Sequence, residues 1–163
     1  MMNSFSKKLN DLLVDTYRQI TKIEEHAIRQ DSKLDLSINE MHMLESVAKV
    51  EDGCTISFIA QDQEITLPSV TVAINKLVKK GYVEKARAKD DGRQVVVKLT
   101  KQGRKVNAGH QYFHENMVRN IVKEFDEEER EALVKGIDKL NKFLKQKLQS
   151  ESKKKHLSEE EGE

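Results

Sequence analysis

The sequence has little cysteine, proline or tryptophan, and each shortage narrows the class of protein. Cys54 is the one cysteine, so no disulfide bond can form within the chain, which fits a reducing compartment. Because no basic residue adjoins it in sequence to lower its pKa, Cys54 is interpreted as a plain loop cysteine rather than a redox sensor. With no tryptophan, one proline and 35% charged residues, the composition is typical of a helix-rich protein with charged outer faces.

Long apolar runs and catalytic motifs are also missing. No stretch approaches the roughly 20 apolar residues that span a bilayer, and the polar N-terminus does not resemble a signal peptide, so we expect a cytoplasmic protein. The sequence has no glycine-rich phosphate loop, no nucleophile elbow and no paired cysteine and histidine. We therefore expect no enzymatic activity, a metallohydrolase being the alternative.

Charge is unevenly distributed along the chain. The formal net charge is +1, but residues 55–105 carry 11 Lys and Arg against 5 Asp and Glu, so this segment is +6 and the remainder is −5. A local basic field on an otherwise balanced protein is typical of a nucleic-acid-binding face. A helical adaptor that binds only protein is an alternative, which the basic segment disfavours.

The middle of the chain predicts a helix-turn-helix. Ser37 and Glu40 have the spacing of a capping box and open a helix. A short helix is expected over 55–62, and a second one from Thr66 to a stop at Gly81, with a tight turn between them. Two short helices in this order form the motif that places its second helix in the DNA major groove.

The second helix of this motif has two distinct faces. Its apolar side is expected to carry Val70, Ala73, Ile74, Leu77 and Val78. The opposite side carries Ser69, Thr71, Val72, Asn75, Lys76 and Lys79. Hydroxyl, amide and ammonium groups contact base edges and phosphates, and an exposed valine contacts a thymine methyl group. A merely solvated face is the alternative.

A short β-hairpin is predicted after that helix. Residues 94–99 alternate between two faces with a period of two, and residues 88–92 form a loop. Arg93 lies at the tip, where Asp91 is placed to hold its guanidinium extended by a charge-assisted hydrogen bond. An arginine presented this way favours a narrow minor groove, and Arg87 and Lys89 add basic groups to the hairpin. A surface turn with a chance ion pair is the alternative.

Long amphipathic helices are predicted at both ends of the chain. Their apolar stripes exceed what a winged-helix lobe can cover, so we expect pairing with a second copy about a twofold axis. The predicted organisation is a helical dimerisation region over 1–35 and 101–149, a winged helix-turn-helix domain over 36–100, and a disordered tail over 150–163. The fold class is thus mainly α, with about six helices and a β-hairpin wing.

The order of these elements resembles that of the MarR family of winged-helix regulators. The resemblance covers about residues 5–148 and depends most on LVKKGYV, on the Asp91 and Arg93 pair, and on the LTKQG segment that follows. It implies a homodimeric, sequence-specific repressor whose recognition helices enter successive major grooves of a pseudo-palindromic operator. The wings would then lie in the flanking minor grooves.

Three segments, IEEHAIR, INEMHML and GHQYFHENMV, resemble the FabT-like branch, which represses fatty-acid synthesis genes. This similarity implies that long-chain acyl groups on acyl carrier protein act as corepressor. It also implies an apolar tunnel for the acyl chain between the dimer helices and the DNA-binding lobe. A regulator that responds to zinc or to a small phenolic ligand is the alternative.

Histidines form a second pattern. His110 and His114 are spaced i, i+4, so two imidazoles on one helix face can share a metal ion. With His42 and Glu24 they are similar to the primary zinc site of the zinc-sensing MarR regulators, which implies a zinc ion held by these four residues. Histidines hydrogen-bonded within a polar hinge are the alternative.

Overall fold

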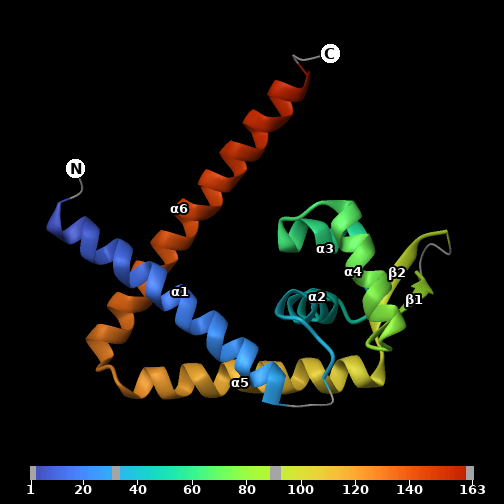
Figure 1. Ribbon diagram of the computed structural model, residues 1–163, viewed down its shortest axis with the longest axis horizontal. Coiled ribbons are helices and arrows are strands. Elements are labelled where there is room, and N and C mark those ends of the chain that lie inside the picture. Colours follow the sequence, from blue (N-terminus) through green and yellow to red (C-terminus); the bar gives the residue numbers. More distant parts are fainter. Residues whose placement is uncertain (1–2, 31–33, 89–92, 161–163) are drawn as a thin grey trace. The chain divides into compact units, whose positions relative to one another are not determined.

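The computed structural model describes residues 3–30, 34–88 and 93–160, with side chains described through 150, and it contains six helices and one two-stranded sheet in these residues (Figure 1). The chain divides into two compact units, Met1–His114 and Glu115–Glu163, and the boundary between them falls within the fifth helix. The elements are α1 Ser4–Gln30, α2 Ile38–Ala48, α3 Ile56–Gln63, α4 Leu67–Lys79, β1 Val83–Arg87, β2 Val95–Leu99, α5 Lys101–Lys123 and α6 Glu127–Glu160. The predicted mainly α winged helix-turn-helix is confirmed.

Side-chain caps define where the short helices begin. The predicted capping box of α2 is present: the Glu40 amide donates to the Ser37 hydroxyl, and the Ser37 amide donates to the Glu40 carboxylate. Thr55 and Thr66 cap α3 and α4 in the same manner, each accepting from the amide three residues later. Each cap satisfies a helix amide that has no carbonyl partner within the helix, which stabilises these short helices at a fixed starting residue.

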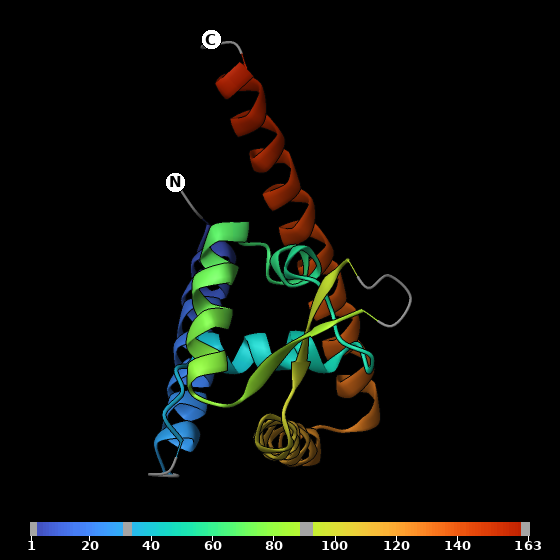
Figure 2. The same cartoon turned by 90° about the vertical axis from the view of Figure 1, so that its right-hand side faces the viewer.

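The core lies in the first unit, where α2, α3 and α4 pack with the hairpin. Leu44, Ile59, Ile74, Leu77 and Val97 are fully buried in it. The hairpin is antiparallel, with Val83 opposite Leu99 and Arg87 opposite Val95. Figure 2 shows its two strands extending beside α4. The buried face of α4 therefore fixes which of its residues remain available on the outside.

The start of α5 is locked onto the hairpin. The Thr100 hydroxyl donates to the Gly81 carbonyl over 2.7 Å and accepts from the Gly103 amide over 3.1 Å, so it caps α5. Gly103 lies so close to the chain that a Cβ there would be 2.0 Å from the carbonyl oxygen of Tyr82. The LTKQG segment is therefore a close-packed joint that requires glycine.

The long helices leave most of their apolar side chains exposed. On α1 these include Phe5, Leu9, Leu12 and Ile23. On α6 they include Leu133, Ile137, Phe143, Leu144 and Leu148. No helix in the described residues combines the length and the apolar character that crossing a bilayer requires.

The disordered tail expected from residue 150 is wrong over 150–160, because α6 continues to Glu160. The prediction considered the loss of apolar periodicity. It overlooked that lysine and glutamate, which make up six of these eleven residues, have high intrinsic helix propensity. Residues 161–163 lie outside the described residues.

Candidate functional site

The outward face of α4 has the side chains that the sequence predicts for it. Val70, Ile74 and Leu77 are buried, whereas the six residues assigned to the opposite side are all exposed, namely Ser69, Thr71, Val72, Asn75, Lys76 and Lys79. Val72 is 56% exposed, so this apolar side chain faces solvent and is not needed for the core, which the other face of α4 contacts. Val78, expected on the apolar side, is 37% exposed and lies at the edge of the core.

Local hydrogen bonds hold the polar groups of this face. The Ser69 hydroxyl lies 2.8 Å from the Thr66 hydroxyl, and the Thr71 hydroxyl donates to the Leu67 carbonyl over 2.9 Å. Neither Lys76 nor Lys79 has a carboxylate partner within the described part of the chain, so both ammonium groups are available to phosphate. The α4 face thus combines positioned hydroxyls with free positive charge.

The hairpin contributes directly to this face. The Lys85 ammonium donates to the Asn75 side-chain oxygen over 2.8 Å, which joins β1 to the middle of α4. Lys85 is absent from the predicted contact set. The sequence could have indicated Lys85, because it lies two residues from Arg87, which the set includes. Residues two apart share one face of a strand.

The tip of the hairpin is basic. The Arg87 guanidinium donates to the Arg93 carbonyl over 3.2 Å, which closes the end of the hairpin, and the Arg93 side chain is exposed. Val96 and Val97 are both buried at this end of β2, while Val95 is 45% exposed. Lys89 and Asp91 lie outside the described residues, so the predicted contact between Asp91 and Arg93 is not tested.

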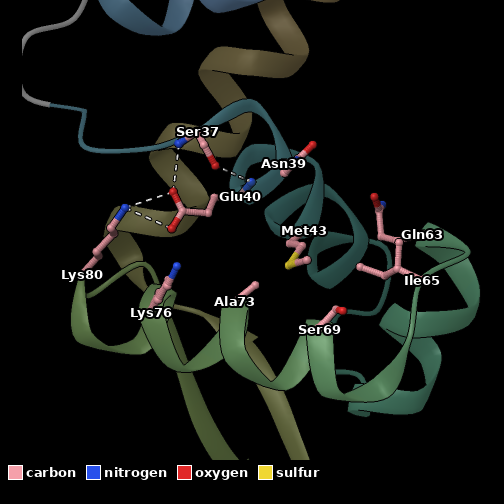
Figure 3. Close-up of a pocket in the computed structure, with 10 residues that line it drawn as sticks. All are labelled: Ser37, Asn39, Glu40, Met43, Gln63, Ile65, Ser69, Ala73, Lys76 and Lys80. Atoms are coloured by element: carbon pink, nitrogen blue, oxygen red, sulfur yellow. Dashed lines mark hydrogen bonds and ion pairs between the residues drawn. The ribbon is translucent and has the colours of Figure 1, made fainter.

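A groove of about 680 Å³ separates α2 from α4 (Figure 3). Asn39 of α2, with Ser69 and Lys76 of α4, provides polar groups at its rim, and Met43 and Ala73 line it with apolar surface. Glu40 closes one end, where its carboxylate is 3.0 Å from the Lys80 ammonium (Figure 3).

The Glu40 carboxylate at the end of the groove accepts hydrogen bonds from the Ser37 amide and the Lys80 ammonium. Burial raises the pKa of Glu40, but hydrogen bonds from Ser37 and Lys80 and the Lys80 charge outweigh it, so the pKa is lowered overall. Glu40 is therefore charged at neutral pH. Because its charge is neutralised by Lys80, the groove is left with the positive charge of Lys76.

A second polar network ties α2 to α3. The Asp62 carboxylate accepts from the Ser46 hydroxyl and from the Lys49 ammonium, and the Gln63 side-chain amide donates to Ser46 over 2.6 Å and to the His42 carbonyl over 3.3 Å. Burial raises the pKa of Asp62, but the hydrogen bonds from Lys49 and Ser46 and the Lys49 charge lower it by more. Asp62 thus fixes the first helix of the helix-turn-helix onto α2.

Histidine and glutamate side chains gather where α1, α2 and α5 meet. The His110 Nε2 atom is 3.1 Å from the His114 Nε2 atom and 3.3 Å from a Glu45 carboxylate oxygen. The His114 Nε2 atom is 3.4 Å from a Glu24 carboxylate oxygen. Burial, together with the His114 and His42 charges, lowers the pKa of His110 to about 4, so this imidazole is neutral at pH 7.

The structure therefore gathers the four predicted metal ligands in one region and adds Glu45. One ligand atom from each of His42, Glu45 and His110 lies within 4.8 Å of the other two. The prediction missed Glu45, although it follows His42 by three residues and so lies on the same face of α2.

A small apolar cavity lies beside His110. Its volume is about 100 Å³, and it is lined by residues of α1, α2 and α5 that include Ile28, Met41 and Phe113. At roughly 30 Å³ for each water in the liquid, this is room for about three water molecules. It is much smaller than the acyl-chain tunnel that the resemblance implies.

Cys54 is less exposed than a loop cysteine is expected to be. It is 4% exposed and its amide and carbonyl pair with Val97 beside the hairpin. Burial raises the pKa of Cys54 to about 11, so the thiol is protonated and unreactive at neutral pH. This agrees with the interpretation that it is not a redox sensor.

Comparison with known proteins identifies one family. The family model described as transcriptional regulator SarA/Rot matches residues 28–109, which include α2, α3, α4, the hairpin and the first part of α5. A solved structure, FabT of Streptococcus pneumoniae in complex with DNA, is 34% identical, with a TM-score of 0.82 over 86% of this chain and 98% of that one.

Two further relatives come from Bacillus subtilis (strain 168), and both are described as uncharacterized HTH-type transcriptional regulators. YfiV is 28% identical over 69% of this chain and 69% of its own length. YhjH is 25% identical over 66% of this chain, and the match spans 61% of the length of that relative.

Proposed function

This chain belongs to the SarA/Rot family of transcriptional regulators with the MarR-like winged-helix fold, and from that premise we propose that it is a repressor that binds a pseudo-palindromic operator as a homodimer. The observation that carries the proposal is the exposed face of α4 beside a basic hairpin. α4 is held on the lobe by a buried apolar stripe, and its opposite side presents only polar groups, lysines and one valine.

We assign base recognition to the first turns of the α4 face. Ser69, Thr71 and Asn75 supply donors and acceptors that match base edges, and the exposed Val72 suits a thymine methyl group. Asn75 is held by Lys85 in the free protein, so binding of adenine by Asn75 would release an ammonium group toward a nearby phosphate.

We assign backbone and minor-groove contacts to the basic groups around α4. Lys76 and Lys79 in the last turn of α4 are placed for phosphates, and Asn39 at the rim of the groove adds a neutral donor. Arg87 and Arg93 are placed at the hairpin tip for the adjacent minor groove, where narrow A·T-rich DNA attracts arginine. Lys89 and Asp91 lie outside the described residues, so they are included in this set on the basis of the sequence alone.

A second copy of the chain is the proposed partner for the exposed apolar stripes. The stripe on α6 repeats at Leu133, Ile137, Leu140 and Leu144, with spacings of four, three and four residues, which is the pattern of helices that pair along a seam. A dimer presents two α4 helices to half-sites about one helical turn apart, which matches the twofold symmetry of a palindrome.

We further propose that the regulated genes serve fatty-acid synthesis and that acyl-acyl-carrier-protein is the corepressor. The 34% identity to FabT and the apolar cavity beside Ile28, Met41 and Phe113 support this. Because the cavity has room for about three water molecules, an acyl chain would enter only if α1, α2 and α5 separate.

Gly109 offers a test of this ligand, since it lines the cavity and a Cβ there meets nothing within 4 Å. Gly109→Leu adds a large apolar side chain at the lining of the cavity, so it is expected to leave DNA affinity without ligand unchanged and to reduce the increase in affinity caused by palmitoyl-acyl-carrier-protein. If the wild-type affinity for operator DNA does not respond to this ligand, the fatty-acid assignment is wrong and the repressor assignment remains.

DNA recognition is tested by titrating a genomic operator fragment, selected by its retention at low salt, with wild type and variants. Arg93→Ala and Asn75→Ala are each expected to weaken binding by about 1–3 kcal/mol, and Asn75→Ala should also relax base preference at one position. Lys79→Ala should weaken binding to every sequence. It should also reduce the slope of the logarithm of the binding constant against the logarithm of salt concentration by the contribution of one phosphate contact.

Lys142→Ala on α6 is the control, since Lys142 belongs neither to α4 nor to the hairpin and is paired with Asp138. Its binding curve should overlay that of the wild type. If no duplex is retained at low salt although the protein is folded and dimeric, the chain is an adaptor that binds only protein.

A further inference from the structure

Two exposed side chains, Asn75 of α4 and Lys85 of β1, meet on the face proposed for base recognition. The Lys85 ammonium donates to the Asn75 side-chain oxygen over 2.8 Å, and within the described residues Asn75 is its one hydrogen-bond partner. The two residues are ten positions apart and lie in different elements, so their contact depends on how the hairpin packs beside α4 (Figure 2). The contact is therefore part of the folded lobe and exists before DNA binds.

The backbone of Lys85 is held at a fixed place beside α4. Lys85 lies opposite Val97 in the hairpin, and Val97 is fully buried. Both the amide and the carbonyl of Val97 pair with Cys54 on its other side. Arg87 shares one face of the strand with Lys85, but its guanidinium donates to the Arg93 carbonyl at the hairpin tip. The two basic groups of β1 thus have different places: Arg87 closes the tip, whereas Lys85 reaches α4.

The hydrogen bond fixes which end of the Asn75 amide is free. An ammonium group has three N–H donors and no acceptor, so the amide atom that faces it must be the oxygen. The Asn75 Nδ2 group is thus left for other partners, and the Lys85 ammonium keeps two further N–H donors beside it. The pair therefore offers a base edge N–H donors and positive charge.

Guanine and adenine respond to such a pair in opposite ways. In the major groove guanine presents two acceptors, N7 and O6, whereas adenine presents the N7 acceptor and the N6 amino donor. Asparagine reads adenine by accepting from N6 and donating to N7. Lys85 already occupies the Asn75 oxygen, and its charge repels a second donor there. Recognition of adenine would therefore cost the contact with Lys85, whereas recognition of guanine keeps it.

We propose that Lys85 is a specificity-determining residue, which with Asn75 selects guanine over adenine at one position of the operator. This inference rests on the proposed function as an operator-binding repressor. Asn75 contacts the base through Nδ2, and Lys85 acts by occupying the Asn75 oxygen and by offering a second donor to guanine. Without Lys85 the amide oxygen is free to accept, so the preference moves toward adenine.

The test is selection of bound duplexes from a random-sequence library, followed by titration of the selected operator and its single-base variants. The position read by Asn75 is the one whose preference is lost in Asn75→Ala. There the wild type should bind the guanine operator roughly tenfold more tightly than the adenine operator, as expected for one good base contact. Lys85→Met keeps an unbranched side chain and removes the charge, and it should lower this ratio by about fivefold or more.

Lys79→Met is the matched control, because it removes the same charge from the α4 face and Lys79 has no hydrogen bond to Asn75 in the described structure. It should weaken binding to the guanine and adenine operators equally. When Asn75→Ala is already present, adding Lys85→Met should leave the base preference at this position unchanged, because the two residues act as a pair. Lys85 is exposed, so thermal unfolding of Lys85→Met should match that of the wild type.

Three results would overturn the proposal. The wild type could select adenine at the position read by Asn75, or Asn75→Ala could keep the preference at every position. Lys85→Met could also weaken binding to both operators equally, which would show that Lys85 contacts only phosphate. If the folded, dimeric wild type retains no duplex at low salt, the proposed function itself fails, and the specificity assigned to Lys85 fails with it.

Discussion

The winged lobe and the long helices use apolar residues in opposite ways. In the lobe, over residues 38–100, the large aliphatic side chains are mostly buried and the exposed face of α4 is polar and basic. On α1 and α6 the large aliphatic and aromatic side chains are mostly exposed. The lobe therefore buries its own core, whereas the apolar faces of the long helices are mostly uncovered by the other described residues of their own unit.

This contrast separates two kinds of stability. The lobe depends on packing within one chain, so its stability should respond to a single added methyl group. The long helices expose enough apolar surface that their stability should depend on protein concentration, as in obligate dimers. Substitutions on the two regions are therefore expected to change different measurements.

The largest effect is expected at the joint between hairpin and α5. Gly103→Ala would place a Cβ 2.0 Å from the Tyr82 carbonyl oxygen, so the backbone must move. We expect the free energy of unfolding to fall by about 3 kcal/mol, near the upper end for overpacking. Gly109→Ala is the matched control within α5, because a Cβ there meets nothing within 4 Å; it should stabilise the helix by about 0.5–1 kcal/mol. Equal effects in urea unfolding would show that the joint is not close-packed.

The next effect concerns association. Ile137 on α6 and Val72 on α4 are both 56% exposed, which makes them a matched pair of apolar positions in the two regions. Ile137→Lys is expected to raise the dissociation constant of the dimer at least tenfold, about 1.4 kcal/mol, as measured by sedimentation equilibrium. Val72→Lys should leave association unchanged and alter DNA binding. A dimer that is insensitive to Ile137→Lys would remove the α6 stripe from the interface.

A pH-dependent effect is expected at the network between α2 and α3. Because the folded-state pKa of Asp62 is lowered, its contribution is present above the unfolded pKa of about 4 and is lost as pH falls through the folded value. Asp62→Asn should reduce the free energy of unfolding at pH 7 by about 1–2 kcal/mol. The two unfolding curves should converge as pH falls below about 4. A difference that stays constant from pH 7 to pH 3 would contradict the assignment.

The smallest effect is expected at Cys54. Its thiol is buried and its pKa is about 11, so a thiol reagent at pH 7.5 should modify the native protein far more slowly than the unfolded chain. DNA affinity should be unchanged after treatment with peroxide followed by its removal. Rapid labelling of the native protein would show that the region around the hairpin opens readily.

The local features of the fold were predictable from the sequence, because caps and turns depend on neighbouring residues. Ser37 and Glu40 form the predicted capping box, and Asp126 and Glu129, which have the same spacing, form another at the start of α6. The two faces of α4 follow from helical periodicity and are confirmed by burial. The continuation of α6 beyond residue 150 was missed, because apolar periodicity detects a packed helix face and not the intrinsic propensity of a charged segment.

Contacts between helices and strands were harder to predict from the sequence. The hydrogen bond between Lys85 and Asn75 depends on how the hairpin lies beside α4, which no local pattern specifies. Glu45 shares a helix face with His42, but its approach to His110 depends on how α2 packs against α5. Sequence periodicity indicates which residues share a face, and the packing of the helices decides which faces meet.

Selection of bound duplexes from a random-sequence library tests the central claim most directly, because the protein itself then chooses the operator sequence. If two copies each place α4 in a major groove, the enriched sequences should form an inverted repeat with half-site centres about 10–10.5 base pairs apart. Arg93→Ala should then enrich the same half-sites with weaker preference at the flanking A·T positions. Enrichment of one unpaired half-site, or of no sequence at all, would contradict the account.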